Sequence, residues 1–402
     1  MKKSTFAIVG TGGRGVFCFG TLLKQREDSE IVAFVEPNPV RAEKAAKELG
    51  IQPPVFHDVP SMLKVVKPDA VIVTSPDATH VTNAVAALEG DCHVLLEKPI
   101  ATHVKDCQTM LDFAKRTGKI LMMGFNLRHH PVIQVLKRVI DEGTVGKIFM
   151  VENREFYNGG RTYMARWNGH YNISGGLWIH KGSHDFDIFQ WLLGFPRPVR
   201  VSSFSGLNVL DSNHFPFPLK DGVQPGPSCR KCPYHDQCHD KYPENSLLYH
   251  IFDDETAAVD GYVVDTCIYL SKKDVHDNGI TIVEYDNGAK AVHSECFVTP
   301  MHDRKYTIYG EKATVEVSLE NREVIVRPRG SEEEIIHRLP PESEDGHGGA
   351  DPILVETFVK AVRGEGYPSN TPEQGMWATA CGEAAELSWR QHRMVEISEL
   401  FS

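Results

Sequence analysis

Short apolar runs alternate with amphipathic stretches along the first third of the chain. Four runs have the length and β-branched composition of buried strands, at residues 6–9, 31–35, 71–74 and 94–96. Segments with apolar residues at helical spacing lie between them, at residues 40–49 and 79–88. This alternation is typical of βαβ units, in which helices cover both faces of a parallel sheet. The pattern predicts a parallel α/β domain over residues 1–125, with a further strand at 118–124.

After about residue 146 the pattern changes to short strands. These are expected at residues 147–157, 199–207, 259–270, 279–285, 306–309, 314–319 and 323–326. Asp286-Asn287-Gly288 predicts a hairpin, because Asn-Gly favours the positive φ angles of a type I′ turn. We expect a second α/β domain over residues 126–402 with a mostly antiparallel open sheet, which binds the substrate and forms oligomer contacts. Residues 211–249, rich in Pro, Gly and Cys, are interpreted as a long loop inserted into that domain.

At 402 residues the chain is long enough for two domains with separate cores. Its net charge of −11 argues against nucleic acid as a partner, because proteins that bind phosphate backbones usually carry a basic face. No run of about 18 apolar residues occurs, so we expect no membrane partner. The first residues lack the long apolar core and cleavage site of a signal peptide. Nine cysteines, mostly scattered, fit the reducing cytoplasm better than a disulfide scaffold.

A glycine-rich turn follows the first predicted strand and opens the first predicted helix. It has the G-x-G-x-x-G pattern of dinucleotide sites, Gly10-Thr11-Gly12-Gly13-Arg14-Gly15. The first glycine permits the tight turn, the second lets the backbone approach a pyrophosphate, and the third allows close packing of helix on strand. The helix N-terminus attracts the phosphate charge. A purely structural glycine turn is the alternative, but the strand-turn-helix context favours a Rossmann dinucleotide site.

A carboxylate ends the second predicted strand. Glu36 lies 21 residues after Gly15, where an acidic residue accepts hydrogen bonds from the adenosine ribose hydroxyls. The same carboxylate would repel a 2′-phosphate. The sequence therefore predicts NAD in preference to NADP. Arg41 nearby keeps NADP open as the alternative.

Further motifs follow in a fixed order along the chain. The first domain contains Thr74-Ser75-Pro76-Asp77-Ala78-Thr79-His80, Leu96-Glu97-Lys98-Pro99 and Gly124-Phe125-Asn126-Leu127-Arg128-His129-His130-Pro131. The second contains Ser174-Gly175-Gly176-Leu177, Lys181-Gly182-Ser183-His184-Asp185-Phe186-Asp187 and Trp191-Leu192-Leu193-Gly194. With the glycine turn, these motifs cover nearly the whole chain, which thereby resembles the Gfo/Idh/MocA oxidoreductase family.

The resemblance implies a Rossmann domain followed by an α/β domain with an open sheet. The substrate, a sugar, sugar phosphate, cyclitol or glycoside, would lie over the nicotinamide in the cleft between them. Beyond the glycine turn and Glu36, the resemblance implies cofactor contacts from Thr74, Pro76, His80, Glu97, Lys98 and Asn126.

The resemblance also implies a catalytic lysine in the E-K-P motif, Lys98 in this chain. An ammonium group can hold the reacting hydroxyl, and burial between cofactor and sugar would lower its pKa. Outside the family context, the alternative is an exposed lysine held by Glu97. The family's second pair is usually an aspartate and a histidine four residues apart. Here the histidine is His184, but His180 fills the aspartate position, where an imidazole could orient hydroxyls or act as a base.

Several residues around this pair are candidates for substrate or metal. Arg166 and Trp167 fit a sugar that carries a carboxylate, sulfonate or phosphate, and a solvated loop with a cation–π pair is the alternative. Arg128 and Lys181, within the family-like motifs, are further candidates for substrate binding. The two histidines also have the His-x₃-His spacing of a metal pair, but no acidic third ligand is near in sequence.

A cysteine cluster lies in the inserted loop. Cys229, Cys232 and Cys238 follow a C-x₂-C-x₅-C pattern, and C-x₂-C places two thiolates on one turn, as in zinc sites. A structural zinc would stabilise a loop with little core of its own, and its fourth ligand would be His235, His239 or Cys267. Free thiols or an incidental disulfide are the alternatives. We expect zinc.

These features support one main function and leave two others open. The main hypothesis is hydride transfer between NAD and a secondary hydroxyl of a sugar, glycoside or cyclitol, with Lys98 and His184 removing the hydroxyl proton. A second hypothesis, drawn from the family, is glycoside hydrolysis by oxidation, elimination, water addition and return of the hydride, with His180 as the extra base. A non-catalytic sensor of NAD and sugar is the third, and intact Lys98 and His184 argue against it. We expect a homodimer or tetramer.

Overall fold

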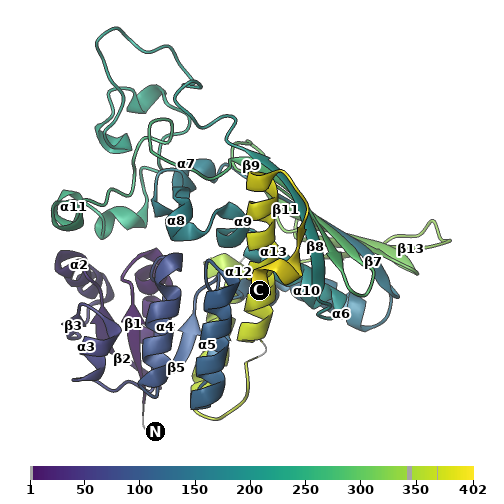
Figure 1. The fold of residues 1–402 in the computed structure, drawn as a ribbon, viewed down its shortest axis with the longest axis horizontal. Coiled ribbons are helices and arrows are strands. Elements are labelled where there is room, and N and C mark those ends of the chain that lie inside the picture. Colours follow the sequence, from purple (N-terminus) through teal and green to yellow (C-terminus); the bar gives the residue numbers. More distant parts are fainter. Residues whose placement is uncertain (1–2, 342–345, 369) are drawn as a thin grey trace.

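Two β-sheets organise the chain. The computed structural model describes residues 3–341, 346–368 and 370–402, and it contains a six-stranded and a nine-stranded sheet. In Figure 1 the helix-covered first sheet lies at the lower left, the open second sheet lies at the right, and the long helix α13 (Pro372–Gln391) runs between them. No helix of the described residues is long and apolar enough to cross a bilayer.

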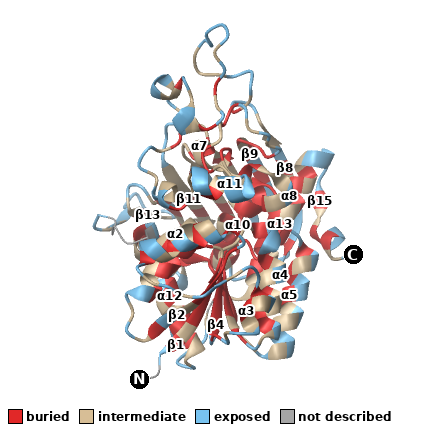
Figure 2. Cartoon of the chain, turned by 90° about the vertical axis from the view of Figure 1, so that its left-hand side faces the viewer, coloured by how far each residue is buried: buried red, intermediate tan, exposed pale blue. Residues whose placement is uncertain are grey.

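The first sheet is parallel throughout, as the apolar runs predict. Its strand order is β3-β2-β1-β4-β5-β6, the order of a Rossmann fold. The strands are β1 (Ser4–Val9), β2 (Ser29–Val35), β3 (Val55–Phe56), β4 (Ala70–Val73), β5 (His93–Leu96) and β6 (Leu121–Met123). Nearly every residue of β1 and β4 is buried, because both faces of the sheet are covered. Figure 2 shows these central strands in red, the colour of buried residues.

Helices follow the strands of this sheet in turn. They are η1 (Arg14–Gly20, a π-helix), α1 (Thr21–Lys24), α2 (Pro39–Leu49), α3 (Val59–Leu63), η2 (Asp77–Thr79), α4 (His80–Glu89), α5 (Val104–Thr117) and η3 (Asn126–His129). The side chain of Asn38 caps the start of α2 by accepting a hydrogen bond from Arg41 N, and Gly50 ends the helix with φ 60°.

A helix from the C-terminal part of the chain completes the apolar cover of the first sheet. Leu354 and Phe358 of α12 (Gly346–Val362) pack in one buried cluster with Phe6 and Phe19. Residues expected in the second domain therefore form part of the core of the first. Because Phe6 is fully buried beneath α12, the first sheet depends on this helix for its apolar cover.

The second sheet is mixed and mostly antiparallel, as expected. Its order is β14-β13-β12-β11-β7-β10-β9-β8-β15, and only β10 and β7 pair in parallel. The strands are β7 (Ile148–Phe156), β8 (Pro198–Gly206), β9 (Asn278–Tyr285), β10 (Lys290–Cys296), β11 (Asp303–Gly310), β12 (Ala313–Ser318), β13 (Glu323–Pro328), β14 (Ile335–Arg338) and β15 (Val395–Glu396).

The β9–β10 hairpin confirms the turn prediction but not the turn type. Gly288 has φ 84°, whereas Asn287 does not have a positive φ, so the turn is not type I′. Gly288 N donates to Tyr285 O, and Tyr285 N donates to Ala289 O. These bonds leave one glycine in the left-handed region, as in longer hairpin turns that end in a bulge.

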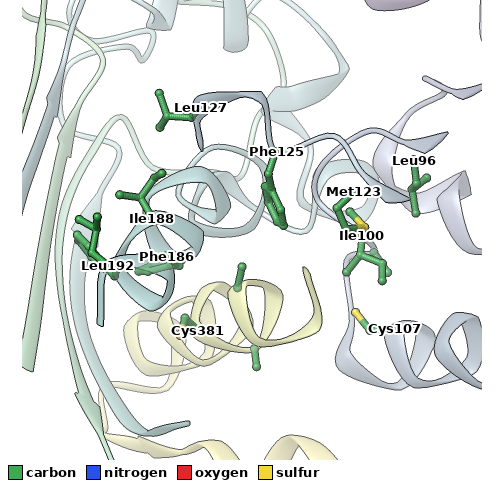
Figure 3. Close-up of a cluster of buried hydrophobic side chains, with 14 of the residues drawn as sticks. Leu96, Ile100, Cys107, Met123, Phe125, Leu127, Phe186, Ile188, Leu192 and Cys381 are labelled. Atoms are coloured by element: carbon green, nitrogen blue, oxygen red, sulfur yellow. The ribbon is translucent and has the colours of Figure 1, made fainter. Parts of the chain in front are cut away.

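The remaining helices pack on the second sheet or lie in its connections. They are α6 (Pro131–Asp141), α7 (Gly160–Tyr163), η4 (Trp167–Gly169), α8 (Tyr171–Ser174), α9 (Leu177–His180), α10 (Ser183–Leu193), η5 (Cys229–Lys231), η6 (His235–Gln237), η7 (Leu247–His250), α11 (Asp254–Asp260) and η8 (Ile397–Phe401). Figure 3 shows apolar side chains of α10 and α13, among them Phe186 and Cys381, close to Met123 and Phe125 of the first domain. One continuous core therefore joins the two sheets.

Residues 259–270 do not form the predicted strand. They contain the end of α11 and an irregular segment that makes one isolated β-bridge, between Ser228 and Thr266. Their apolar side chains, such as Val264 and Ile268, are instead buried in a cluster with Leu210 and Phe297. Apolar spacing alone could not distinguish this packing from a strand.

Candidate active site

A cavity of about 460 Å³ lies at the carboxyl ends of the first sheet's strands, which is the usual ligand position of open α/β sheets. On one side it is lined by the turns after β1, β4 and β5. On the other side it is lined by residues before and within α9 and α10. The predicted residues on its wall are Gly12, Gly13, Arg14, Thr74, His80, Glu97, Lys98, Asn126, Arg166, Trp167, His180, Lys181 and His184.

The glycine turn forms a backbone cradle at this cavity. Gly10 has φ 87°, and a Cβ at Gly15 would overlap the Gly10 carbonyl oxygen. A Cβ at Gly12, by contrast, would meet nothing within 4 Å, and Gly12 borders the cavity. The backbone is thus open towards the cavity, at the start of η1, where a pyrophosphate would lie. The residues present therefore fit a dinucleotide.

Arg14 ties this turn to two other segments. Its guanidinium lies 2.6 Å from Glu97 and 2.8 Å from Asp351, and Asn126 donates to Asp351 at 2.8 Å. Burial alone would raise the pKa of Asp351, but hydrogen bonds from His347 and Arg14 hold it well below its usual range. The segment around Asp351, for which no role was predicted, thus anchors Arg14 and Asn126, two residues predicted to bind the cofactor.

The turn after β4 has its own hydrogen bonds. Thr74 Oγ1 donates to Gly10 O at 2.7 Å, which joins the turns after β1 and β4. The ring nitrogens of His80 lie 2.8 Å from Pro99 O and 2.9 Å from Ser75 O. Pro76 precedes η2 and is not among the lining residues, so it shapes the turn without facing the cavity.

Glu36 is buried beyond the cavity wall. Its carboxylate accepts hydrogen bonds from Thr11 N, Thr11 Oγ1 and Asn38 N, and it pairs with Arg41 at 3.0 Å. Arg41 also contacts Asp260, a residue of α11. Glu36 is therefore fixed at the end of β2, as predicted, but together with a cation and a second carboxylate.

Lys98 points at the opposite wall. Its Nζ donates to His180 O at 2.7 Å, which places the ammonium between the turn after β5 and α9. Burial lowers the pKa of Lys98, although the nearby Tyr163 and Asp77 act in the opposite direction. A buried amine with a lowered pKa can exchange a proton with a substrate hydroxyl more readily than an exposed lysine.

His180 is held through both ring nitrogens. Its Nδ1 lies 2.6 Å from Asp77 Oδ2, and its Nε2 lies 2.8 Å from Asn168 Nδ2. Burial and the neighbouring Lys98 ammonium lower the pKa of His180 well below its usual value, while burial raises the pKa of Asp77 to about 7. A carboxylate is thus present near the position where the family usually has its aspartate, but it comes from the turn after β4.

His184 differs from His180. It lies one turn further along, in α10, and its buried Nδ1 has no hydrogen-bond partner among the residues that the structure describes. Burial and the Lys98 charge lower the pKa of His184 well below its usual value, so its ring is neutral. The ring lines the cavity, where a neutral imidazole can accept a proton.

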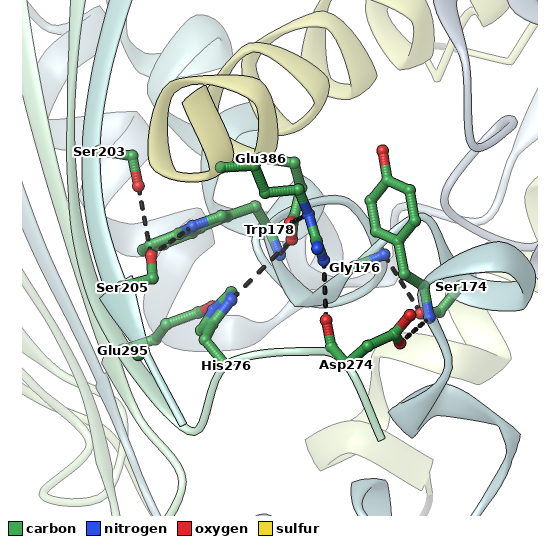
Figure 4. Close-up of polar contacts among 12 residues, drawn as sticks. Ser174, Gly176, Trp178, Ser203, Ser205, Asp274, His276, Glu295 and Glu386 are labelled. Atoms are coloured by element: carbon green, nitrogen blue, oxygen red, sulfur yellow. Dashed lines mark hydrogen bonds and ion pairs between the residues drawn. The ribbon is translucent and has the colours of Figure 1, made fainter. Parts of the chain in front are cut away.

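A polar network behind α9 holds this helix in place (Figure 4). Trp178 Nε1 donates to Ser205 Oγ at 2.9 Å, and Trp178 N donates to Glu386 of α13. His276 packs against the Trp178 ring, with centroids 4.7 Å apart, and its Nε2 lies 2.5 Å from Glu295. Apart from Ser205, which is partly buried, these groups are buried, so the second sheet and α13 together fix the position of His180.

A second cavity of about 400 Å³ adjoins the first, and the two share Asn126, Tyr163, Lys181, His184 and His347. Lys181 lies 3.0 Å from Glu155 and 4.7 Å from the centre of the Tyr157 ring. Burial would raise the pKa of Tyr163, but the Lys181 and Lys98 ammonium groups lower it below its usual value. Aromatic rings beside charged groups suit a sugar ring.

Of the four residues predicted to bind substrate, one lies elsewhere. Arg166 and Trp167 line the first cavity, and the described residues give Arg166 no carboxylate partner. Arg128 lines neither cavity, because its guanidinium is buried against Asp187 and also donates to Gln374 at 2.8 Å. The Arg128 prediction is therefore wrong, and this arginine links η3 to α10 and α13.

The expected zinc site is not supported. Cys229, Cys232, Cys238 and Cys267 line one small apolar cavity, but in the described part of the chain no group of three His, Cys, Asp or Glu side chains is arranged to hold a metal. The same finding weighs against metal binding at the histidine pair. All nine cysteines are free thiols. The physical reason is that the inserted loop has a core, formed by residues such as Tyr242, Ile268 and Tyr269.

Comparison with known proteins identifies the family of this chain. The profile of the oxidoreductase family with an NAD-binding Rossmann fold matches residues 4–125, and that of its C-terminal alpha/beta domain matches residues 137–397. The putative oxidoreductase YteT of Bacillus subtilis (strain 168) is 31% identical to this chain, over 100% of this chain and 99% of that protein. A D-glucoside 3-dehydrogenase of Escherichia coli (strain K12) is 31% identical over 50% of this chain and 56% of that protein.

A solved structure of levoglucosan dehydrogenase, in complex with NADH and levoglucosan, superimposes with a TM-score of 0.74. The match covers 98% of this chain and 100% of that one at 18% identity, and it shows the shared fold. With both family profiles matched and a full-length relative at 31% identity, this chain belongs to the Gfo/Idh/MocA family of oxidoreductases.

Proposed function

We propose that this protein is an NAD-dependent oxidoreductase that transfers a hydride to or from the carbon of a secondary hydroxyl in a sugar, glycoside or cyclitol. The observation that carries the proposal is that Lys98 and His184 line one cavity whose wall also includes the glycine cradle. When bound there, NAD supplies the hydride acceptor and the chain supplies the acid–base groups.

The residues divide this work by their contacts. Lys98 would hold the oxygen of the reacting hydroxyl, because its ammonium points into the space between the two walls. His184, whose ring lines the cavity, and Lys98 in its neutral form would together remove the hydroxyl proton. His180, with both nitrogens engaged, would position the Lys98 ammonium through its own carbonyl and keep α9 against the turn after β4.

The shape of the site favours a substrate with a ring and an anionic group. The second cavity would hold the sugar ring beside Tyr157 and Lys181, next to the reacting groups. Arg166, which has no carboxylate partner among the described residues, would bind a carboxylate, sulfonate or phosphate of the substrate. The relative that acts on D-glucosides supports a glycoside, and it does not identify the sugar.

A direct experiment separates net oxidation from the alternative of hydrolysis without net redox change. The enzyme and NAD are mixed with a panel of aryl glycosides, and the absorbance of NADH and the release of the aryl group are followed together. The proposed dehydrogenase accumulates NADH without releasing the aryl group. Aryl release without NADH would establish the hydrolase, and neither signal with any glycoside or cyclitol would favour a sensor.

The compartment and assembly are part of the proposal. Nine free thiols support the reducing cytoplasm. The open face of the second sheet exposes apolar side chains on adjacent strands, including Phe204, Ile280 and Ile282, with exposed fractions of 79%, 53% and 48%. Because a patch of this kind is usually covered, we propose a homodimer or tetramer built on this face.

A further inference from the structure

The segment inserted between β8 and β9 returns to the first domain. After the cysteine-rich loop, α11 lies against α2, far from the sheet that carries the insertion (Figure 1), and His250 of η7 lies 3.3 Å from Glu48 of α2. Ile251 is fully buried with Ile8, Phe34 and Leu49 of the first domain. Leu248, Phe252 and Tyr262 line the cavity at the end where Gly12 and Gly13 lie. The inserted segment therefore forms the outer wall of the dinucleotide site.

At this wall, Arg41, the cation next to Glu36, also pairs with a second carboxylate. Arg41 lies 3.0 Å from Glu36 Oε1 and 2.5 Å from Asp260 Oδ2. Asn38 donates to the same Asp260 oxygen at 2.8 Å, and the Arg41 guanidinium lies 4.7 Å from the centre of the Phe252 ring. Although burial would raise the pKa of Asp260, hydrogen bonds from Asn38 and Arg41 lower it, which keeps the carboxylate ionised.

The chemistry of this arrangement concerns the adenosine ribose. NAD presents a 2′-hydroxyl beside the acidic residue that ends β2, whereas NADP presents a dianionic phosphate there. The phosphate needs a cation with free donors, and Arg41 is the arginine at this point. With one carboxylate on each side, the single positive charge of Arg41 is outweighed, so the group is net negative and would repel a phosphate.

We propose that Asp260, contributed by the inserted segment, is a specificity residue that makes this protein reject NADP. Glu36 alone would neutralise the Arg41 charge, and Asp260, from outside the first domain, makes the group net negative. This inference rests on the proposed preference for NAD, and it assigns to the inserted segment a role in selecting the cofactor.

The docking of the segment does not depend on Asp260 alone. Lys44 of α2 lies 2.6 Å from Asp253 and 2.6 Å from Glu255, and Ile251 adds its buried contact. Glu255→Gln is therefore a matched control. It removes an acidic contact between the same two helices without touching Arg41.

The test measures dissociation constants for NAD and NADP by titration calorimetry, with no substrate present. Asp260→Asn keeps the shape of the side chain, and Asp260→Ser is a second variant in case Asn is misfolded; melting temperatures verify folding. We expect NADP to bind at least about tenfold more tightly to Asp260→Asn than to the wild type, the range of one charge-assisted hydrogen bond. NAD binding should change less than about threefold, and Glu255→Gln should keep the wild-type ratio.

A double variant identifies the group responsible. In the Asp260→Asn background, Arg41→Met should abolish the gain in NADP affinity, because the released guanidinium is then absent. A ratio of NADP to NAD affinity that stays within about twofold of wild type in Asp260→Asn and Asp260→Ser would overturn the inference, as would a gain that survives Arg41→Met. A wild-type preference for NADP is a separate result, which would contradict the proposed cofactor.

Discussion

Asp77 and His180 lie 103 residues apart in the chain and meet at 2.6 Å, with the carboxylate on Nδ1 of the ring. The contact joins the turn after β4 to the end of α9, across the cavity that the glycine turn closes. His180 O in turn accepts a hydrogen bond from Lys98 Nζ. The position of Lys98 thus depends, through His180 on the opposite wall, on a carboxylate of its own wall.

Asp77→Asn should lower turnover by about ten- to 100-fold, the range seen when the partner that orients a functional histidine is lost. It should also move the pH profile in a definite direction. Lys98 accepts a proton only as the neutral amine, so the rate of oxidation rises as pH rises through its pKa, which burial has lowered from 10.5. Removing the Asp77 charge lowers that pKa further, so the rising limb should shift to lower pH. A profile of kcat/KM against pH in Asp91→Asn, an exposed control, should match the wild type. A rising limb that shifts to higher pH in Asp77→Asn would contradict this prediction.

Arg166→Ala should discriminate between substrates by charge. For a sugar with a carboxylate, KM should rise at least about tenfold, because one charge-assisted hydrogen bond is lost. For the neutral sugar of the same ring geometry, KM should stay within about twofold. Equal losses on both substrates would mean that Arg166 shapes the loop and does not bind an anion.

The inserted loop should be stabilised by its apolar cluster and not by a metal. Ile268→Ala, at a buried position, should lower the free energy of unfolding by about 2–5 kcal/mol. Leu270→Ala, two residues away and 45% exposed, should change it by less than about 0.5 kcal/mol. A chelator should leave the melting temperature unchanged. A fall in melting temperature on chelation, restored by zinc, would establish the metal site that the described residues do not show.

The open face of the second sheet should be covered by another copy of the chain. Ile280 and Ile282 of β9 are exposed side by side with Phe204 of β8. Ile280→Asp should therefore shift the molecular mass measured by light scattering towards one chain, because a carboxylate cannot be buried there without a partner. Val65→Asp, an exposed change on the first domain, is the control. A wild-type protein that is already monomeric would contradict the prediction.

The fold of the first domain could be predicted from local patterns in the sequence. The apolar runs, the glycine turn and Glu36 all act over short stretches of chain, and the structure has them where the pattern predicts. The same holds for Lys98, which is the second residue after β5. The strand expected at residues 259–270 failed because apolar spacing reports burial, and this segment is buried by side-chain packing without a ladder.

The sequence alone did not predict which residues far apart in the chain contact each other. Nothing near His180 in the chain indicates that Asp77 and Asn168 occupy its two nitrogens, and nothing near Arg41 indicates Asp260. Arg128 was misassigned for the same reason, because its partner Asp187 lies 59 residues away on α10. Such pairs are created by the packing of the two sheets, so only the fold reveals them.

The most direct test of the account is a single-turnover measurement on Lys98→Ala and His184→Ala. Each variant is loaded with NAD, its affinity for NAD is measured, and the absorbance of NADH is followed after a sugar substrate is added. Lys105→Ala, an exposed lysine on α5, is the control. The account predicts NAD affinity within about threefold of wild type in both variants and a rate of NADH formation at least about 10²-fold lower, the smaller losses expected for an acid–base group. Wild-type rates of NADH formation in both variants would contradict it.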